Sequence, residues 1–143
     1  MKTYWQLLIC VTVLISILSI SASASAQEDA AADAVATAFV NARGAAQMPK
    51  LERMGKNIFR KKVCKHDMRF SSGLIDTVLY VTLDPAQLPE SAQRLAQWPG
   101  QTAARFGVGV CLAGATSGGK PTYSVLIATY ESRWNSFLGF LRD

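Results

Sequence analysis

The fold is decided by two apolar stretches, RFGVGVCL at residues 105–112 and TYSVLIATY at residues 122–130. Both are rich in β-branched and aromatic residues, and the glycine-containing segment 113–121 between them is typical of a loop. The pattern predicts a β-hairpin. Gly107 and Gly109 alternate with valine in the first strand, which indicates either a β-bulge or a face against which another backbone packs closely.

The chain before this hairpin is predicted to form three helices and one strand. Apolar residues recur at helical spacing in the alanine-rich segment 30–46 and again in segment 51–67. Residues 74–83 are rich in β-branched and aromatic residues and favour a strand. Residues 89–96 favour a short helix, because the proline at its start lacks only an N–H that the first turn does not use.

The last segment, residues 131–143, is predicted to be an amphipathic helix. Its apolar side chains follow the spacing i, i+3, i+4 and i+7: Trp134, Phe137, Leu138 and Leu141. Two roles stay open for this helix, which either caps the core or docks on a partner or a membrane surface. The expected fold class is α+β, a small three-layer α-β-α sandwich with a mainly antiparallel sheet and a C-terminal amphipathic helix.

The N-terminus has the pattern of a cleavable secretory signal peptide, residues 1–26. Lys2 precedes an uncharged apolar run, and small residues up to Ala26 supply the A-x-A cleavage pattern. We therefore expect one mature domain, residues 27–143, that is secreted or periplasmic. The alternative is that residues 4–20 stay attached as a membrane anchor, because this run approaches the roughly 20 residues that a membrane span requires.

Two cysteines, Cys64 and Cys111, remain after the expected cleavage. An even number of cysteines in an oxidising compartment favours a disulfide between them, and two buried free thiols are the alternative. The paired ligand spacings of zinc sites are missing from the sequence, so no metal ion and no other cofactor is expected.

Four basic residues are predicted to share one arc of the second helix and its end: Lys61, Lys62, Lys65 and Arg69. They form either a solvated face or a docking patch for an anionic lipid or glycan. The formal net charge of the whole chain is +5, and the basic residues are too scattered to indicate nucleic-acid binding.

The sequence predicts that the protein is not an enzyme. A nucleophilic triad needs a base beside the nucleophile, and the chain holds one histidine, His66. Glu28 and Asp29 form a close acidic pair, but they lie at a chain end that we expect to fray after cleavage. The SGGK segment at residues 117–120 precedes a predicted strand, whereas a phosphate-binding loop needs a following helix. A hydrolase with an unrecognised site is the remaining enzymatic alternative.

Two motifs and the order of the elements resemble the CAP superfamily of cysteine-rich secretory, antigen 5 and pathogenesis-related proteins. FVNAR at residues 39–43, with MPKL at 48–51, resembles the first helix of that family and the segment after it. FGVGVC at residues 106–111, with TYSVLI at 122–127, resembles its closing hairpin. The resemblance implies an α-β-α sandwich.

The chain departs from the family at the residues that would carry its chemistry. The family builds a cleft from two histidines and two acidic residues that hold a divalent ion, whereas this chain has a single histidine in a different context. Asn41 and Arg43 are separated by one residue instead of two. The resemblance therefore implies a shortened, non-catalytic domain that binds an envelope component or another exported protein, and no functional residue carries over.

Overall fold

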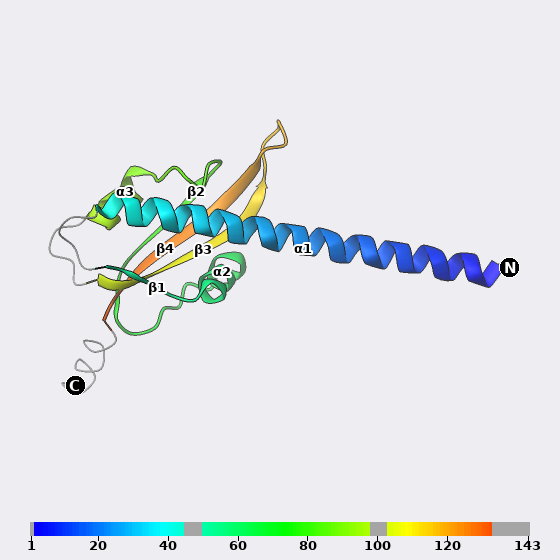
Figure 1. The fold of residues 1–143 in the computed structure, drawn as a ribbon, viewed down its shortest axis with the longest axis horizontal. Helices are drawn as coiled ribbons and strands as arrows, with labels where there is room; N and C mark the ends of the chain where they lie inside the picture. Colours follow the sequence, from blue (N-terminus) through cyan, green and yellow to red (C-terminus); the bar gives the residue numbers. More distant parts are fainter. Residues whose placement is uncertain (1, 45–49, 98–102, 133–143) are drawn as a thin grey trace.

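The computed structural model describes residues 2–44, 50–97 and 103–132, and for residues 2–22 only the backbone. Within these residues the chain forms three helices and one sheet with the strand order β1-β3-β4-β2 (Figure 1). The elements are α1 (Lys2–Arg43), β1 (Glu52–Arg53), α2 (Lys56–Lys65), β2 (Leu74–Thr82), α3 (Glu90–Gln97), β3 (Ala103–Ala115) and β4 (Pro121–Glu131). The predicted hairpin, the strand before it and the short helix are confirmed within a few residues.

The sheet is mixed, so the expectation of a mainly antiparallel sheet was wrong. β1 runs parallel to β3, while β4 is antiparallel to both β3 and β2. The predicted second helix does not begin at residue 51, because Leu51 is buried in the core and the N–H of Met54 donates to the carbonyl of Phe106 at 2.7 Å. This pairing keeps the segment extended until Gly55, after which α2 begins.

Helices cover both faces of the sheet, which gives the predicted three layers. Side chains of β3 and β4 alternate between the faces, as the two-residue period of a strand requires. Val108 and Ile127 pack with α1 and α3, while Leu126 packs with Phe59 and Val63 of α2 on the opposite face. The two apolar clusters on either side of the sheet form the core.

At Gly107 and Gly109 of β3, α2 approaches the sheet closely. A Cβ atom on Gly107 would lie 2.1 Å from the ring of Phe59, and one on Gly109 would lie 2.3 Å from the Phe59 carbonyl oxygen. The ladder between β3 and β4 shows no register shift at either glycine. Of the two alternatives from the sequence, close backbone approach is therefore confirmed and the bulge is excluded.

Helix α1 is longer than predicted, because it runs without a break from the predicted signal peptide into the domain. Figure 1 shows that it crosses the sheet and continues well beyond it. Side chains of α1 are described from residue 23 onwards, and among them Ser25 and Gln27 lie near the N-terminal end. The Ser25 hydroxyl accepts a hydrogen bond from Arg60 at 2.6 Å, and the Gln27 amide donates one to the Tyr123 hydroxyl at 2.9 Å. The packed part of the helix thus starts beside the predicted cleavage site at Ala26.

Two sequence predictions concern segments near the chain ends. Among the residues with described side chains, no helix is long and apolar enough to cross a membrane. The predicted C-terminal helix with Trp134, Phe137, Leu138 and Leu141 lies outside the described residues, and its first expected residue, Glu131, instead closes β4.

The glycine contact predicts how a single methyl group affects stability. Gly109→Ala should lower the free energy of unfolding by about 1–3 kcal/mol, because the new Cβ meets backbone atoms of α2 that cannot turn aside. Gly118→Ala is the control, since its nearest neighbour is the Thr116 hydroxyl at 3.8 Å, and it should stay within about 0.5 kcal/mol of the wild type. Urea unfolding measures both, and equal midpoints for the two variants would contradict the close approach.

Candidate functional site

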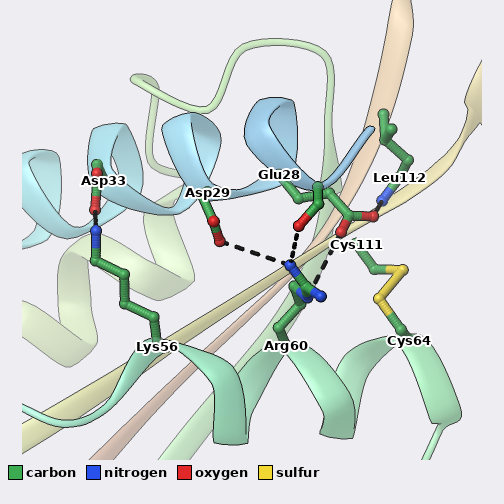
Figure 2. Close-up of polar contacts among 9 residues, drawn as sticks. Glu28, Asp29, Asp33, Lys56, Arg60, Cys64, Cys111 and Leu112 are labelled. Carbon is green, nitrogen blue, oxygen red and sulfur yellow. Dashed lines mark hydrogen bonds and ion pairs between the residues drawn. A yellow bond between two sulfur atoms is a disulfide. The ribbon is translucent and has the colours of Figure 1, made fainter. Parts of the chain in front are cut away.

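A carboxylate covers the open edge of β3. Only Arg105 and Phe106 of this strand pair with β1, so the rest of the edge has no strand beside it among the described residues. Glu28 of α1 accepts a hydrogen bond from the N–H of Leu112 at 3.0 Å, and its carboxylate lies 3.8 Å from Nε of Arg60 (Figure 2). The edge donor is thus satisfied by a side chain instead of another strand.

Arg60 of α2 connects the two helices across this edge. Its guanidinium contacts Ser25 at 2.6 Å and lies 3.8 Å from the carboxylate of Asp29, in addition to Glu28. The Arg60 side chain is one-third exposed and that of Glu28 is 13% exposed, so the Arg60–Glu28 pair is partly shielded from water. Figure 2 shows the carboxylates of Glu28 and Asp29 pointing towards this one guanidinium. In the intact helix these two residues are held in place, and fraying after cleavage stays a prediction.

The predicted disulfide between Cys64 and Cys111 is confirmed. The two Cα atoms lie 5.3 Å apart, and the bond joins residues separated by 47 positions. Cys64 follows Arg60 by one helical turn, and Cys111 precedes Leu112, so the disulfide and the Glu28 contact secure the same place on β3. The alternative of two free thiols was therefore wrong.

A second ionic contact joins the start of α2 to α1. Oδ1 of Asp33 forms ion pairs with Nη1 of Arg53 at 2.7 Å and with Nζ of Lys56 at 2.6 Å. Hydrogen bonds from Lys56 and Arg53 hold the pKa of Asp33 below its usual value. No local sequence pattern predicts this contact, because Asp33, Arg53 and Lys56 belong to three different elements of the fold.

The predicted basic patch is partly used within the fold. Lys62 donates to the backbone carbonyl of Arg69 and lies 5.2 Å from the centre of the Phe70 ring. Arg69 pairs with Asp67 at 2.9 Å, which lowers the pKa of the Asp67 carboxyl and raises that of Arg69. Lys61 and Lys65 are exposed and have no ion-pair partner among the described residues. The structure therefore leaves two of the four basic side chains for a ligand.

Arg43, in the motif that resembles the CAP first helix, is buried at the end of α1. Its Nη2 donates to the carbonyl of Ala103 at 3.3 Å, while Nε and Nη1 have no partner among the described residues. Burial lowers the pKa of this guanidinium. Its contact ties the end of α1 to the start of β3, which is a structural role.

Strand β2 and the residue directly after it expose large apolar side chains at the other edge of the sheet. The exposed fractions are 57% for Leu79, 64% for Val81 and 53% for Leu83. Leu79 lies opposite Leu126, on the face that α2 occupies, but α2 packs against β3 and β4 and leaves β2 uncovered. Tyr80 points to the other face, where burial raises its pKa to about 12. We call Leu79, Val81, Leu83 and the outer backbone edge of this strand the β2 surface.

Cys64 and His66, the thiol and the base considered for catalysis, do not form a nucleophile–base pair in the described residues. Cys64 is in the disulfide, and His66 is exposed in a left-handed conformation at the end of α2, where its N–H donates to the Val63 carbonyl. An open hollow of about 410 Å³ lies beside α1 and is lined by Asp33, Ala34, Thr37, Ala38, Asn41 and Ala86. Its charged group, Asp33, is already paired with two cations.

Comparison with protein-family models, with curated proteins and with solved structures finds no match to this chain. The β2 surface is the candidate site because its apolar side chains are exposed at an edge of the sheet. The sequence analysis identified the strand but missed this surface, although the two-residue spacing of Leu79, Val81 and Leu83 is a signal for one shared face.

The contact at the β3 edge predicts that removal of Glu28 lowers the stability of the fold more than removal of its neighbour Asp29. Glu28→Ala should destabilise the fold by about 1–3 kcal/mol, because it leaves the Leu112 N–H without its acceptor. Asp29→Ala should cost less than about 1 kcal/mol, since Asp29 is half exposed and makes a long contact. Urea unfolding compares the two, and Glu28→Gln should fall between them because its amide oxygen still accepts. Equal losses at both positions would contradict the role of Glu28.

The disulfide predicts a larger effect on stability. The double variant Cys64→Ser, Cys111→Ser should lose about 4 kcal/mol, because the reduced chain regains the entropy of the closed loop when it unfolds. Thermal unfolding with and without a thiol reductant measures the effect. The reductant should lower the melting temperature of the wild type and leave that of the double variant unchanged, and an insensitive wild type would reject a stabilising disulfide.

Proposed function

We propose that this protein is an exported, non-catalytic binding domain that recognises a protein partner through the β2 surface. The observation that supports the proposal is the exposure of Leu79 and Val81 on the edge strand β2 and of Leu83 directly after it, each more than half exposed. Edge strands in soluble proteins are normally shortened, covered or charged, and exposed apolar patches mark interaction sites. An extended segment of a partner can pair with such an edge and cover the apolar row.

Export is supported by the signal-peptide pattern of residues 1–26 and by the disulfide, since such bonds persist in oxidising compartments. Gln27, the expected first residue of the mature domain, contacts the Tyr123 hydroxyl, whereas cleavage would remove Ser25 and its contact with Arg60. A chain retained by residues 4–20 is the alternative. N-terminal sequencing of protein from its native compartment separates the two, because release gives Gln27 as the first residue and anchoring retains the upstream residues.

A protein partner is favoured over an anionic envelope component by the state of the basic side chains. Lys62 and Arg69 make contacts within the fold, which leaves Lys61 and Lys65 as a small cationic surface. The CAP-like assignment remains part of the proposal and rests on the motifs at residues 39–51 and 106–127. A hydrolase is disfavoured because the described residues bring no base to a nucleophile.

Partner capture tests the β2 surface with matched variants. Leu79→Lys should weaken capture of a partner by at least about tenfold, because burial of one leucine contributes about 1.5–3 kcal/mol. Ile58→Lys on α2 is the control, since Ile58 and Leu79 are both 57% exposed. Crosslinking in the native compartment, followed by quantitative mass spectrometry, measures the captured proteins.

The same experiment separates the alternatives. The double variant Lys61→Ala, Lys65→Ala should capture as much partner as the wild type. If this variant loses binding while Leu79→Lys retains it, the anionic component replaces the protein partner as the ligand. Turnover of peptidoglycan or peptide substrates by the purified protein, lost on substitution of one residue, would overturn the non-catalytic assignment.

A further inference from the structure

We propose that the partner of the β2 surface is a second copy of this chain, paired with it antiparallel about a two-fold axis at Leu79. The inference rests on the proposed function, because it names the occupant of the same surface. In such a pair the two β2 strands lie side by side, and the sheets of the two copies become one.

The backbone of β2 can support this pairing. The strand forms one edge of the sheet and pairs with β4 along eight positions from Leu74 to Thr82. The N–H of Thr77 donates to the carboxylate of Asp76 at 2.7 Å, so the backbone of Thr77 faces outwards. In the pairing this N–H exchanges the Asp76 carboxylate for the carbonyl of Val81 in the second copy. Backbone groups alternate in direction along an antiparallel strand, so those of Leu79 and Val81 face the same outer side.

The side chains are complementary in the register centred on Leu79. This register places Leu79 opposite its own copy and Thr77 opposite Val81. Ile75, which is 36% exposed, and Leu83 lie at the two ends of the paired segment. Leu79 and Val81 of both copies then form one apolar row on the face that carries α2. Among the described helices and strands, α2 packs on β3 and β4 and leaves Leu79 and Val81 exposed on this face.

Charge favours this register and a second copy. Asp76 lies opposite the uncharged Thr82, whereas moving the centre to Tyr80 would place Asp76 opposite Asp84, which is a like-charge pair. From residue 77 to residue 83 the strand carries no charged side chain, although the chain has a net charge of +5. Two copies of a basic protein can therefore approach along this strand without opposing lysines or arginines within it.

A charge exchange at the centre tests the pairing. The wild-type protein, expressed from the full chain, should change from monomer to dimer as its concentration rises in sedimentation equilibrium. Leu79→Lys and Leu79→Glu should each be monomeric, because the new charge faces an identical charge across the axis. An equal mixture of the two variants should form a heterodimer, since lysine then faces glutamate. Ile58→Lys should dimerise as the wild type does.

Three results would overturn the inference. A wild type that stays monomeric at all concentrations rejects the second copy, while the proposed function is judged separately by partner capture with Leu79→Lys and Ile58→Lys. Dimers that persist in both Leu79 variants place the interface elsewhere. Variants that are monomeric alone and also in the mixture reject the register centred on Leu79. Unchanged unfolding midpoints of the variants show that each result reports on association and not on folding.

Discussion

The close approach of α2 to β3 is the contact on which the rest of the structure depends. It is possible because Gly107 and Gly109 have no side chain where the Phe59 ring and carbonyl lie. At this distance Cys64 reaches Cys111, and Arg60, one turn earlier, reaches the carboxylates of α1. The disulfide and the ion pairs are therefore consequences of the backbone packing, and they hold α2 to the one strand that can accept it.

The same packing explains why β2 is exposed. A ten-residue helix that lies against β3 is too narrow to cover the whole sheet, since adjacent strands lie about 5 Å apart and a helix with its side chains is about 10–12 Å wide. α2 packs against β3 and β4, where it buries Leu126, and it does not extend over the central part of β2. Leu79 is the neighbour of Leu126 in the ladder but remains more than half exposed. The candidate site is thus the part of the apolar face that the helix leaves open.

The sequence predicted the features that local patterns encode. The hairpin, β2 and α3 follow from residue type and spacing within one segment, and the disulfide follows from the two cysteines left after cleavage. β1 was missed because Met54 pairs with Phe106, about fifty positions later, and this pairing overrides the helical pattern of the segment. The Glu28–Arg60 contact and the exposure of Leu79 depend on where α2 lies across the sheet. No local pattern carries that information.

The two edges of the sheet differ in their central residues, and this difference is the strongest argument for the function of β2. At the β3 edge, a short parallel strand pairs with Arg105 and Phe106, and the partly shielded Glu28 carboxylate accepts the N–H of Leu112. At the β2 edge, the Asp76 carboxylate accepts the N–H of Thr77 at one end and Asp84 lies beyond the other, while the residues between them are uncharged and partly apolar. Charged residues, proline and bulges are the usual protection against pairing between chains. Because β2 carries a bulge only near Leu74, and its central residues lack a charge or a proline, the unprotected part of the edge coincides with the exposed apolar row. Backbone pairing and side-chain burial would therefore favour the same partner strand at the same place.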